Sequence, residues 1–152
     1  MKLYILDAAH KSIPCINFIA INDPKLIFYV HIDKKFTLDV FSKNIKNLIY
    51  IDHRMDVKWG GFSQVQVTLN LFEVSLRGSK ADFFHFISCE DLILCEYQLL
   101  IENLCWDYDQ FFDKIIPTKK QAWFGGGWFS IRKQEVEKII ENIKKIFENG
   151  EK

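Results

Sequence analysis

The sequence predicts an α/β protein with a mostly parallel sheet flanked by helices on both faces. Short apolar runs recur between residues 2 and 87, and each run is followed by polar residues. The stretches between the runs carry apolar residues at helical spacing, and this alternation is typical of a parallel sheet whose strands are joined by helices. With 152 residues, 49% of them hydrophobic, the chain has the size for one core and a single domain, residues 1–152.

Four strands are expected in the first part of the chain. Each is short, consists mostly of apolar residues that favour strands, and stops at polar residues, as buried strands do. The four segments are Lys2–Leu6, Leu26–Ile32, Asn47–Ile51 and Phe83–Ile87. Further along, residues 122–131 predict two short extended pieces around a bend at Gly125–Gly127.

Helices are expected between these strands and at the C-terminal end. The expected segments are residues 12–22, 38–44, 63–76, 96–105 and 135–147. The last of them is amphipathic, with one valine and four isoleucines on its apolar side. Residues 107–120 carry mixed signals and predict no single element.

The segment Ile51–Leu76 carries a pair of glycines in front of a predicted helix. Ser63 is the expected N-cap of that helix, and Gln66, three residues later, would complete a capping box. Gly60 and Gly61 let a ligand approach the backbone, and the first N–H groups of a helix lack partners within it. The turn therefore suits a bound anion.

Charged and aromatic residues precede this turn. Arg54 and Lys58 have the chemistry to neutralise a diphosphate, and the alternative is a surface ion pair with Asp52 or Asp56. Trp59 either stacks on a sugar or base or forms a lid over the core.

Polar residues also gather where the predicted strands end, and ligands bind at this edge of a parallel sheet. Asp33 follows the second strand, where such folds present a carboxylate to a ribose or a base, and it is equally well interpreted as a turn residue paired with a neighbouring lysine. His10 and His31 are candidate polar contacts at strand ends. Glu90 and Asp91 follow the fourth strand and suit hydrogen bonds to sugar hydroxyls or general base catalysis.

Composition argues against several other functions. The formal net charge is zero, so we expect no broad electrostatic binding of nucleic acid or of an anionic membrane. The N-terminal residues predict neither a signal peptide nor a membrane span. The four cysteines form no CxxC pair, which favours reduced thiols in a cytoplasmic protein, free or peripheral to a membrane, and the alternative is a disulfide between two of them.

Residues 107–109 form a DxD sequence, a pattern that holds a metal in many nucleotide-sugar transferases. No buried strand precedes it. We therefore interpret Asp107 and Asp109 as surface residues and expect no metal site.

Five segments of the chain, in order, resemble one family. They are Ala9–Lys11, Tyr29–Lys35, Asp56–Phe72, Phe84–Leu94 and Gly125–Val136. The second (YVHIDKK) and the third (DVKWGGFSQVQVTLNLF) are the most specific. With them the chain resembles the core-2/I-branching β-1,6-N-acetylglucosaminyltransferases and their relatives, the peptide O-xylosyltransferases.

The resemblance implies a GT-A-like, Rossmann-type fold that transfers N-acetylglucosamine or xylose from a UDP-sugar to an acceptor hydroxyl, with inversion and without a metal or other cofactor. Asp33 would lie near the uracil or ribose, and Asp91 would face the transferred sugar. The implied donor-binding residues are His10, Asp33, Arg54, Trp59, Gly60 and Gly61. Gly127 and Trp128 would approach the donor or the glycan or other hydroxyl acceptor.

The chain also departs from the family pattern. Cys89–Ile93 differs from the usual sequence at the sugar site. The family's catalytic glutamate and the basic residues that replace a metal lie beyond the matching segments, so no catalytic base is assigned, and Glu90 and Asp91 are the only candidates. The alternatives are a catalytically inactive fragment, or a subunit of a split transferase whose partner chain supplies the missing C-terminal part. Another nucleotide-binding α/β protein is a third interpretation.

Overall fold

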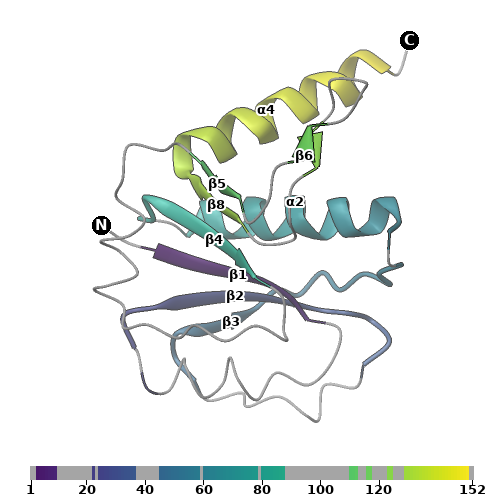
Figure 1. Cartoon of the computed structure of the whole chain (residues 1–152). Helices are drawn as coiled ribbons and strands as arrows, with labels where there is room; N and C mark the ends of the chain where they lie inside the picture. Colours follow the sequence, from purple (N-terminus) through teal and green to yellow (C-terminus); the bar gives the residue numbers. More distant parts are fainter. Residues whose placement is uncertain are drawn as a thin grey trace.

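A six-stranded sheet forms the centre of the computed structural model (Figure 1). The structure describes residues 3–9, 22, 24–36, 45–58, 60–78, 80–87, 110–112, 116–117, 123–124 and 129–150. In spatial order the strands are β3 (Leu48–Tyr50), β2 (Ile27–Ile32), β1 (Leu3–Ala9), β4 (Phe83–Ile87), β8 (Phe129–Arg132) and β5 (Gln110–Phe112). A separate two-stranded sheet pairs β6 (Ile116–Pro117) with β7 (Trp123–Phe124).

Most of the sheet is parallel, as the sequence predicts. β1 pairs in parallel with both β2 and β4, and β2 pairs in parallel with β3. Only β8 runs against its neighbours, β4 and β5, among the described pairs of this sheet. The chain moves from β1 outward to β3 and then returns to β4 on the other side of β1. In open α/β sheets such a reversal creates the crevice where ligands bind, outside the carboxyl ends of the strands.

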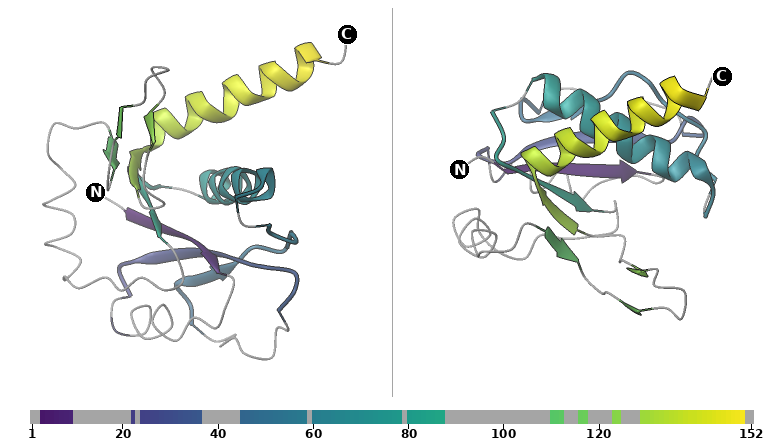
Figure 2. Two further views of the ribbon diagram at one scale, coloured as in Figure 1. Left: turned by 45° about the vertical axis from the view of Figure 1, so that its right-hand side comes forward. Right: turned by 90° about the horizontal axis from the view of Figure 1, so that it is seen from above.

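Two helices, α2 (Phe62–Arg77) and α4 (Lys133–Gly150), cover the same face of the sheet (Figures 1 and 2). The expected helices that would cover the second face, residues 12–22 and 38–44, lie outside the described residues except for Asn22. The helix expected at residues 96–105 also lies outside them.

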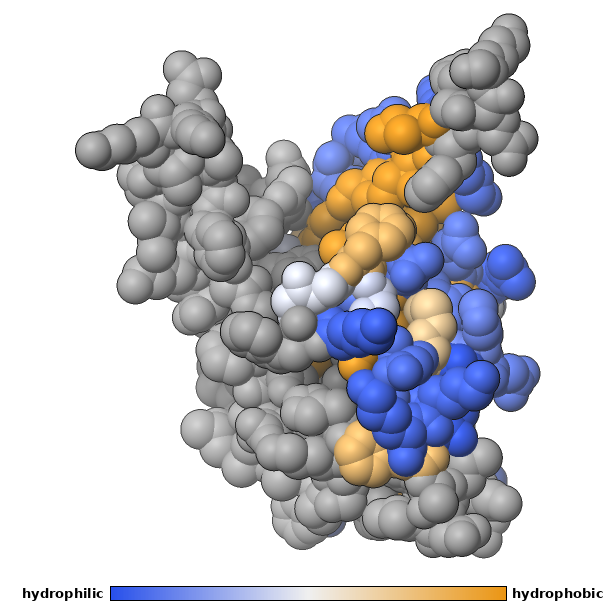
Figure 3. Space-filling model, turned by 90° about the vertical axis from the view of Figure 1, so that its right-hand side faces the viewer, coloured by the Kyte–Doolittle hydropathy of each residue, from blue (hydrophilic) through white to orange (hydrophobic). Residues whose placement is uncertain are grey.

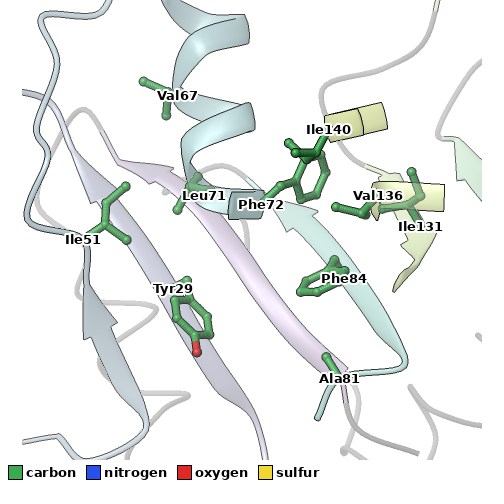
Figure 4. Close-up of a cluster of buried hydrophobic side chains, with 10 residues drawn as sticks. All are labelled: Tyr29, Ile51, Val67, Leu71, Phe72, Ala81, Phe84, Ile131, Val136 and Ile140. Carbon is green, nitrogen blue, oxygen red and sulfur yellow. The ribbon is translucent and has the colours of Figure 1, made fainter. Parts of the chain in front are cut away.

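The core lies between these helices and the sheet (Figure 4). Phe84 of β4 is fully buried, and its ring meets that of Phe72 from α2 edge to face, with centroids 6.1 Å apart. Val136 and Ile140 of α4 pack into the same cluster. Packing of this kind supplies most of the stability of an amphipathic helix. The core therefore fixes α2 above the parallel strands.

The observed elements agree closely with the expected ones, with a few shifts of boundary. β4 has the expected limits, and the two extended pieces predicted for residues 122–131 are β7 and β8. β1 continues to Ala9 rather than ending at Leu6, because its pairing with β2 extends as far as Ala9 opposite Ile32. The polar Asp7 hides this continuation in the sequence.

An apolar stripe along α4 passes from the core to the surface. Ile140 is buried, whereas Ile146, almost two turns later, is 68% exposed. On α2, Phe62 and Val65 in the first turns are also exposed. Figure 3 shows the apolar strip of α4 above a hydrophilic area. Neither described helix combines the length and the apolar character needed to cross a bilayer.

Truncation of two isoleucines on α4 should separate the buried part of this stripe from the exposed part. Ile140→Ala should lower the free energy of unfolding by about 2 kcal/mol or more, because it opens a cavity in the core. Ile146→Ala should change it by less than about 1 kcal/mol, since its side chain is already in water. Urea denaturation followed by circular dichroism measures both, and equal losses would contradict this assignment of the core.

Candidate functional site

Two segments meet at the carboxyl end of β2. One is the turn of residues 33–36 that follows the strand, and the other is the segment of residues 51–58 that leads from β3 towards α2 (hereafter the 51–58 segment). The backbone N–H of Ile51 donates to the carbonyl of Val30 at 3.0 Å, and that of Lys34 donates to the carbonyl of Met55 at 3.0 Å. The 51–58 segment is therefore bound along the end of β2.

Two side chains of β2 and its turn complete this attachment. The backbone N–H of Met55 donates to Nε2 of His31 at 2.9 Å, and that of Val57 donates to Oδ2 of Asp33 at 3.2 Å. Both acceptors are buried. A buried N–H without an acceptor costs about 1–3 kcal/mol, so these two side chains keep the segment in place.

Asp33 also shapes its own turn. Its Oδ1 accepts a hydrogen bond from the backbone N–H of Lys35 at 2.9 Å, the pattern by which aspartate favours turns. Its carbonyl accepts from the N–H of Phe36 at 3.0 Å. The sequence offered two interpretations of Asp33, a ligand-binding carboxylate or a turn residue. The structure shows the contacts of a turn residue. A carboxylate oxygen has two lone pairs, so Oδ1 and Oδ2 each keep one beyond these contacts.

Arg54 reaches back over the same turn. Its Nε donates to the carbonyl of Ile32 at 3.2 Å, and its Nη2 donates to the carbonyls of Asp33, at 2.8 Å, and of Phe36. Among the described residues, the ion pair expected as the alternative, with Asp52 or Asp56, is not formed. Nη1 makes no hydrogen bond to a described residue. The guanidinium therefore joins the 51–58 segment to the end of β2 and keeps part of its donor capacity.

Lys35 joins the turn of residues 33–36 to the 51–58 segment on the exposed side of the site. Its Nζ lies 2.7 Å from Asp56 and donates to the carbonyl of Val57 at 2.8 Å, with the Asp33 carboxylate 3.8 Å away. The hydrogen bond between Lys35 and Asp56 raises the pKa of the lysine and lowers that of the aspartate. Exposed pairs of this kind contribute little to stability, so the buried contacts dominate.

The glycine turn leads from this segment into α2, and here the predicted capping box is wrong. α2 begins at Phe62 with Gly61 as N-cap, and no side chain caps it. The hydroxyl of Ser63 instead accepts from the backbone N–H of Lys58 at 2.8 Å. Because the two glycines let the chain enter the helix earlier, Ser63 lies inside the first turn and points back to the loop.

A second side chain of α2 holds the same turn. Oε1 of Gln64 accepts from the backbone N–H of Gly60 at 2.7 Å. Nδ2 of Asn70 donates to the carbonyl of His53 at 3.2 Å and ties the helix to the 51–58 segment. The sequence pattern of α2 gave no sign of either contact, because both join a side chain to backbone groups of another segment.

The two glycines are required for different reasons. Gly60 has φ +70°, a left-handed conformation, and a Cβ built there would meet nothing within 4 Å. At Gly61 a Cβ would lie 3.1 Å from the carbonyl oxygen of Lys58. Gly60 is thus needed for its backbone angle and leaves open space beside the backbone, whereas Gly61 is needed for close packing of the turn.

His31 is fully buried at the end of β2. Because Nε2 accepts the Met55 N–H, the neutral ring must carry its proton on Nδ1, which has no hydrogen-bond partner among the described residues. Burial lowers the pKa of His31 to about 4, aided by the positive charge of Arg54 and by His53, and opposed by the negative charge of Asp33. His31 is therefore neutral at neutral pH.

The structure brings four of the expected site residues into one continuous unit. Asp33 and Arg54 are in contact, and Gly60 and Gly61 continue the segment that Arg54 belongs to. The remaining expected residues, His10, Trp59, Glu90, Asp91, Gly127 and Trp128, lie outside the described residues, as do Asp107 and Asp109. Within the described part of the chain, no cluster of three or more histidine, cysteine or carboxylate side chains is arranged to hold a metal.

Comparison with known families identifies the chain. The sequence model of the Core-2/I-Branching enzyme family matches residues 16–121. The chain belongs to the Core-2/I-branching enzyme family. The matched region spans most of its length and includes β2, the 51–58 segment, the glycine turn, α2 and β4. No curated protein matches the chain.

Membership in the Core-2/I-branching family places the chain among glycosyltransferases. The contacts described above all lie inside the matched region, at the edge of the sheet where α/β proteins bind ligands. This edge is the candidate functional site.

Acid should destabilise the protein through His31. Its pKa is about 4 in the folded chain and near 6.5 when unfolded, so the unfolded chain binds the proton more tightly between these values. The free energy of unfolding should fall by up to about 3 kcal/mol as the pH drops from 6.5 to 4, and this contribution should level off below pH 4.

Urea denaturation at several pH values, on the wild type and on His31→Gln, measures this dependence. The glutamine variant lacks the titrating ring, so its stability should fall less over the same range. Parallel curves for the two proteins would show that His31 does not carry the effect.

Replacement of the two glycines should reveal their different requirements. Gly60→Ala should cost about 1–2 kcal/mol, the penalty of a left-handed alanine, and Gly60→Asn should cost less because asparagine tolerates that conformation. At Gly61 asparagine should bring no relief over alanine, since any Cβ meets the Lys58 carbonyl. Thermal unfolding of the four variants tests this, and relief by asparagine at Gly61 would contradict it.

Proposed function

We propose that the chain binds a UDP-sugar at the carboxyl edge of the sheet and transfers its sugar, N-acetylglucosamine or xylose, to an acceptor hydroxyl with inversion at the anomeric carbon. The observation that carries the proposal is the fixed arrangement of Asp33, Arg54 and the glycine turn within the region matched by the family. A donor site must be rigid before the ligand arrives if binding energy is to be used for catalysis.

In this proposal the nucleotide lies against the end of β2. The Asp33 carboxylate has acceptor capacity left for an N–H of the uracil or a hydroxyl of the ribose. His10 and Trp59 complete the binding of the nucleoside in the proposed site.

The diphosphate lies over the glycine turn. The first N–H groups of α2 have no side-chain cap, and the open space beside Gly60 lets an anion approach them. Arg54, through Nη1, and the exposed Lys58 add positive charge nearby. Fixed donors of this kind stabilise the charge that develops on the leaving diphosphate, so the proposed reaction needs no metal.

The transferred sugar and the acceptor lie beyond the diphosphate, near Asp91, Gly127 and Trp128. In an inverting transfer a base removes the proton of the acceptor hydroxyl, whose oxygen attacks the anomeric carbon as the bond to UDP breaks on the opposite side. Asp91 and Glu90 are the candidates for this base.

Isothermal titration calorimetry tests the proposed donor site. UDP and UDP-N-acetylglucosamine or UDP-xylose should bind, with the same affinity in EDTA and in manganese. ADP should bind at least tenfold more weakly, because the loss of contacts to the base lowers the binding free energy by about 1.4 kcal/mol or more. Asp33→Asn should weaken UDP binding, whereas the control Asp52→Asn, at an exposed position of the 51–58 segment, should not. Absence of heat with every uridine nucleotide would remove the proposal.

A second candidate function is donor binding without turnover, in which the chain is one subunit of a split transferase. The exposed apolar side chains of Phe62 and Val65 on α2 and of Ile146 on α4 favour it, because contact with another polypeptide would remove them from water. Release of UDP by the isolated chain, in the presence of an acceptor sugar, distinguishes the two functions. Steady turnover by the isolated chain would exclude the second.

A further inference from the structure

The Met55 backbone is the point at which the 51–58 segment is attached most directly to β2. Its N–H donates to Nε2 of His31, and its carbonyl accepts from the N–H of Lys34. Its N–H is thus bound to a side chain of β2, and its carbonyl is bound to the backbone of the turn that follows β2. Movement of Met55 away from β2 would break both of these bonds.

The residue before Met55 is Arg54, whose guanidinium spans three carbonyls of β2 and its turn. The residue two positions after it is Val57, which binds the Asp33 carboxylate. Displacement of Met55 therefore moves Arg54 and changes the environment of Asp33 together. Both side chains are charged groups of the proposed donor site.

The acceptor for the Met55 N–H belongs to a residue of β2, which lies inside the sheet. The carbonyls of Val30 and Ile32 at the end of β2 already accept from Ile51 and Arg54, and a side chain supplies the acceptor for the Met55 N–H. A neutral imidazole does so with a rigid ring that holds one acceptor nitrogen at a fixed distance from the strand. Aspartate or glutamate would bring a second buried negative charge close to Asp33.

We propose that His31 is a positioning residue of the donor site, whose Nε2 fixes the Met55 backbone and thereby sets the positions of Arg54 and Asp33 for the nucleotide. This inference rests on the proposed function for its ligand and goes beyond it in naming a buried residue that does not touch the ligand. His31 belongs to the interior of the sheet, and it acts on the site through one hydrogen bond.

Three substitutions test the role of the acceptor. His31→Gln places an amide oxygen about as far from the backbone as Nε2, whereas His31→Asn is too short and His31→Leu has no acceptor. The Leu and Asn variants should weaken UDP binding by about tenfold, the effect of losing one buried hydrogen bond, and Gln should restore most of the affinity. If the Leu variant fails to fold, the comparison of Asn with Gln carries the test.

Amide hydrogen exchange provides a measurement that needs no ligand. In the Leu and Asn variants, exchange at residues 55–58 should accelerate more than exchange in β4 and α2, and Gln should restore the protection. If the wild type fails to bind UDP while exchange behaves as expected, the proposed function is wrong and the positioning of the segment by His31 stands.

Ile140→Ala is the matched control, because it destabilises the protein from the far side of the core and leaves the site intact. It should leave the dissociation constant for UDP unchanged. Equal weakening by Ile140→Ala and by His31→Asn would show that binding follows overall stability and would overturn the proposal. Wild-type affinity and wild-type exchange in a folded Leu or Asn variant would overturn it as well.

Discussion

The hydrogen bonds that join the end of β2 to the 51–58 segment are the constraint on which the site depends. They use backbone N–H groups on one side and two buried side chains, His31 and Asp33, on the other. In the same junction the Arg54 side chain of the 51–58 segment donates to carbonyls at the end of β2. Hydrogen bonds at Ile51, Met55 and Val57 thus attach the irregular segment to the end of β2 at three points.

The hydrophobic core also helps to fix the position of the glycine turn. Ile51 belongs to the buried cluster, and Met55 and Val57 pack against it. The segment is therefore held by apolar packing as well as by its hydrogen bonds to β2. α2 starts where the segment ends, and the contact between Phe72 and Phe84 fixes the helix above β4. Packing at Phe72, ten residues after the start of α2, thus helps to fix the position of the helix N-terminus.

Much of the fold could be predicted from the sequence, because buried strands are marked by their composition. Phe83–Ile87 is a continuous apolar run between polar residues, and its limits were predicted correctly. The start of α2 was not. Ser63 has the chemistry of an N-cap, but the conformational freedom of Gly60 and Gly61 moves the helix start forward, and sequence spacing does not record that freedom.

The candidate site was predictable in part. Polar residues after apolar runs pointed to Asp33 and Arg54, and the structure places them in contact. The turn contact of Asp33 with Lys35 was one of the sequence interpretations. The contacts of Asp33 with Val57 and of Arg54 with the end of β2 were not predictable, because these partners are backbone groups of distant residues, which have the same chemistry at every position. His31 illustrates the same limit: its residue type suggested a polar contact, and only the fold shows that the contact is the N–H of Met55.

The place of β1 at the middle of the sheet has a consequence for biosynthesis. Leu3 pairs with Phe83, so during synthesis β1 obtains β4 as a neighbour only after eighty further residues have been made. Until then one of its edges is open, and open edges of apolar strands promote association with other chains. A nascent chain must therefore protect this edge of β1 until β4 has been made.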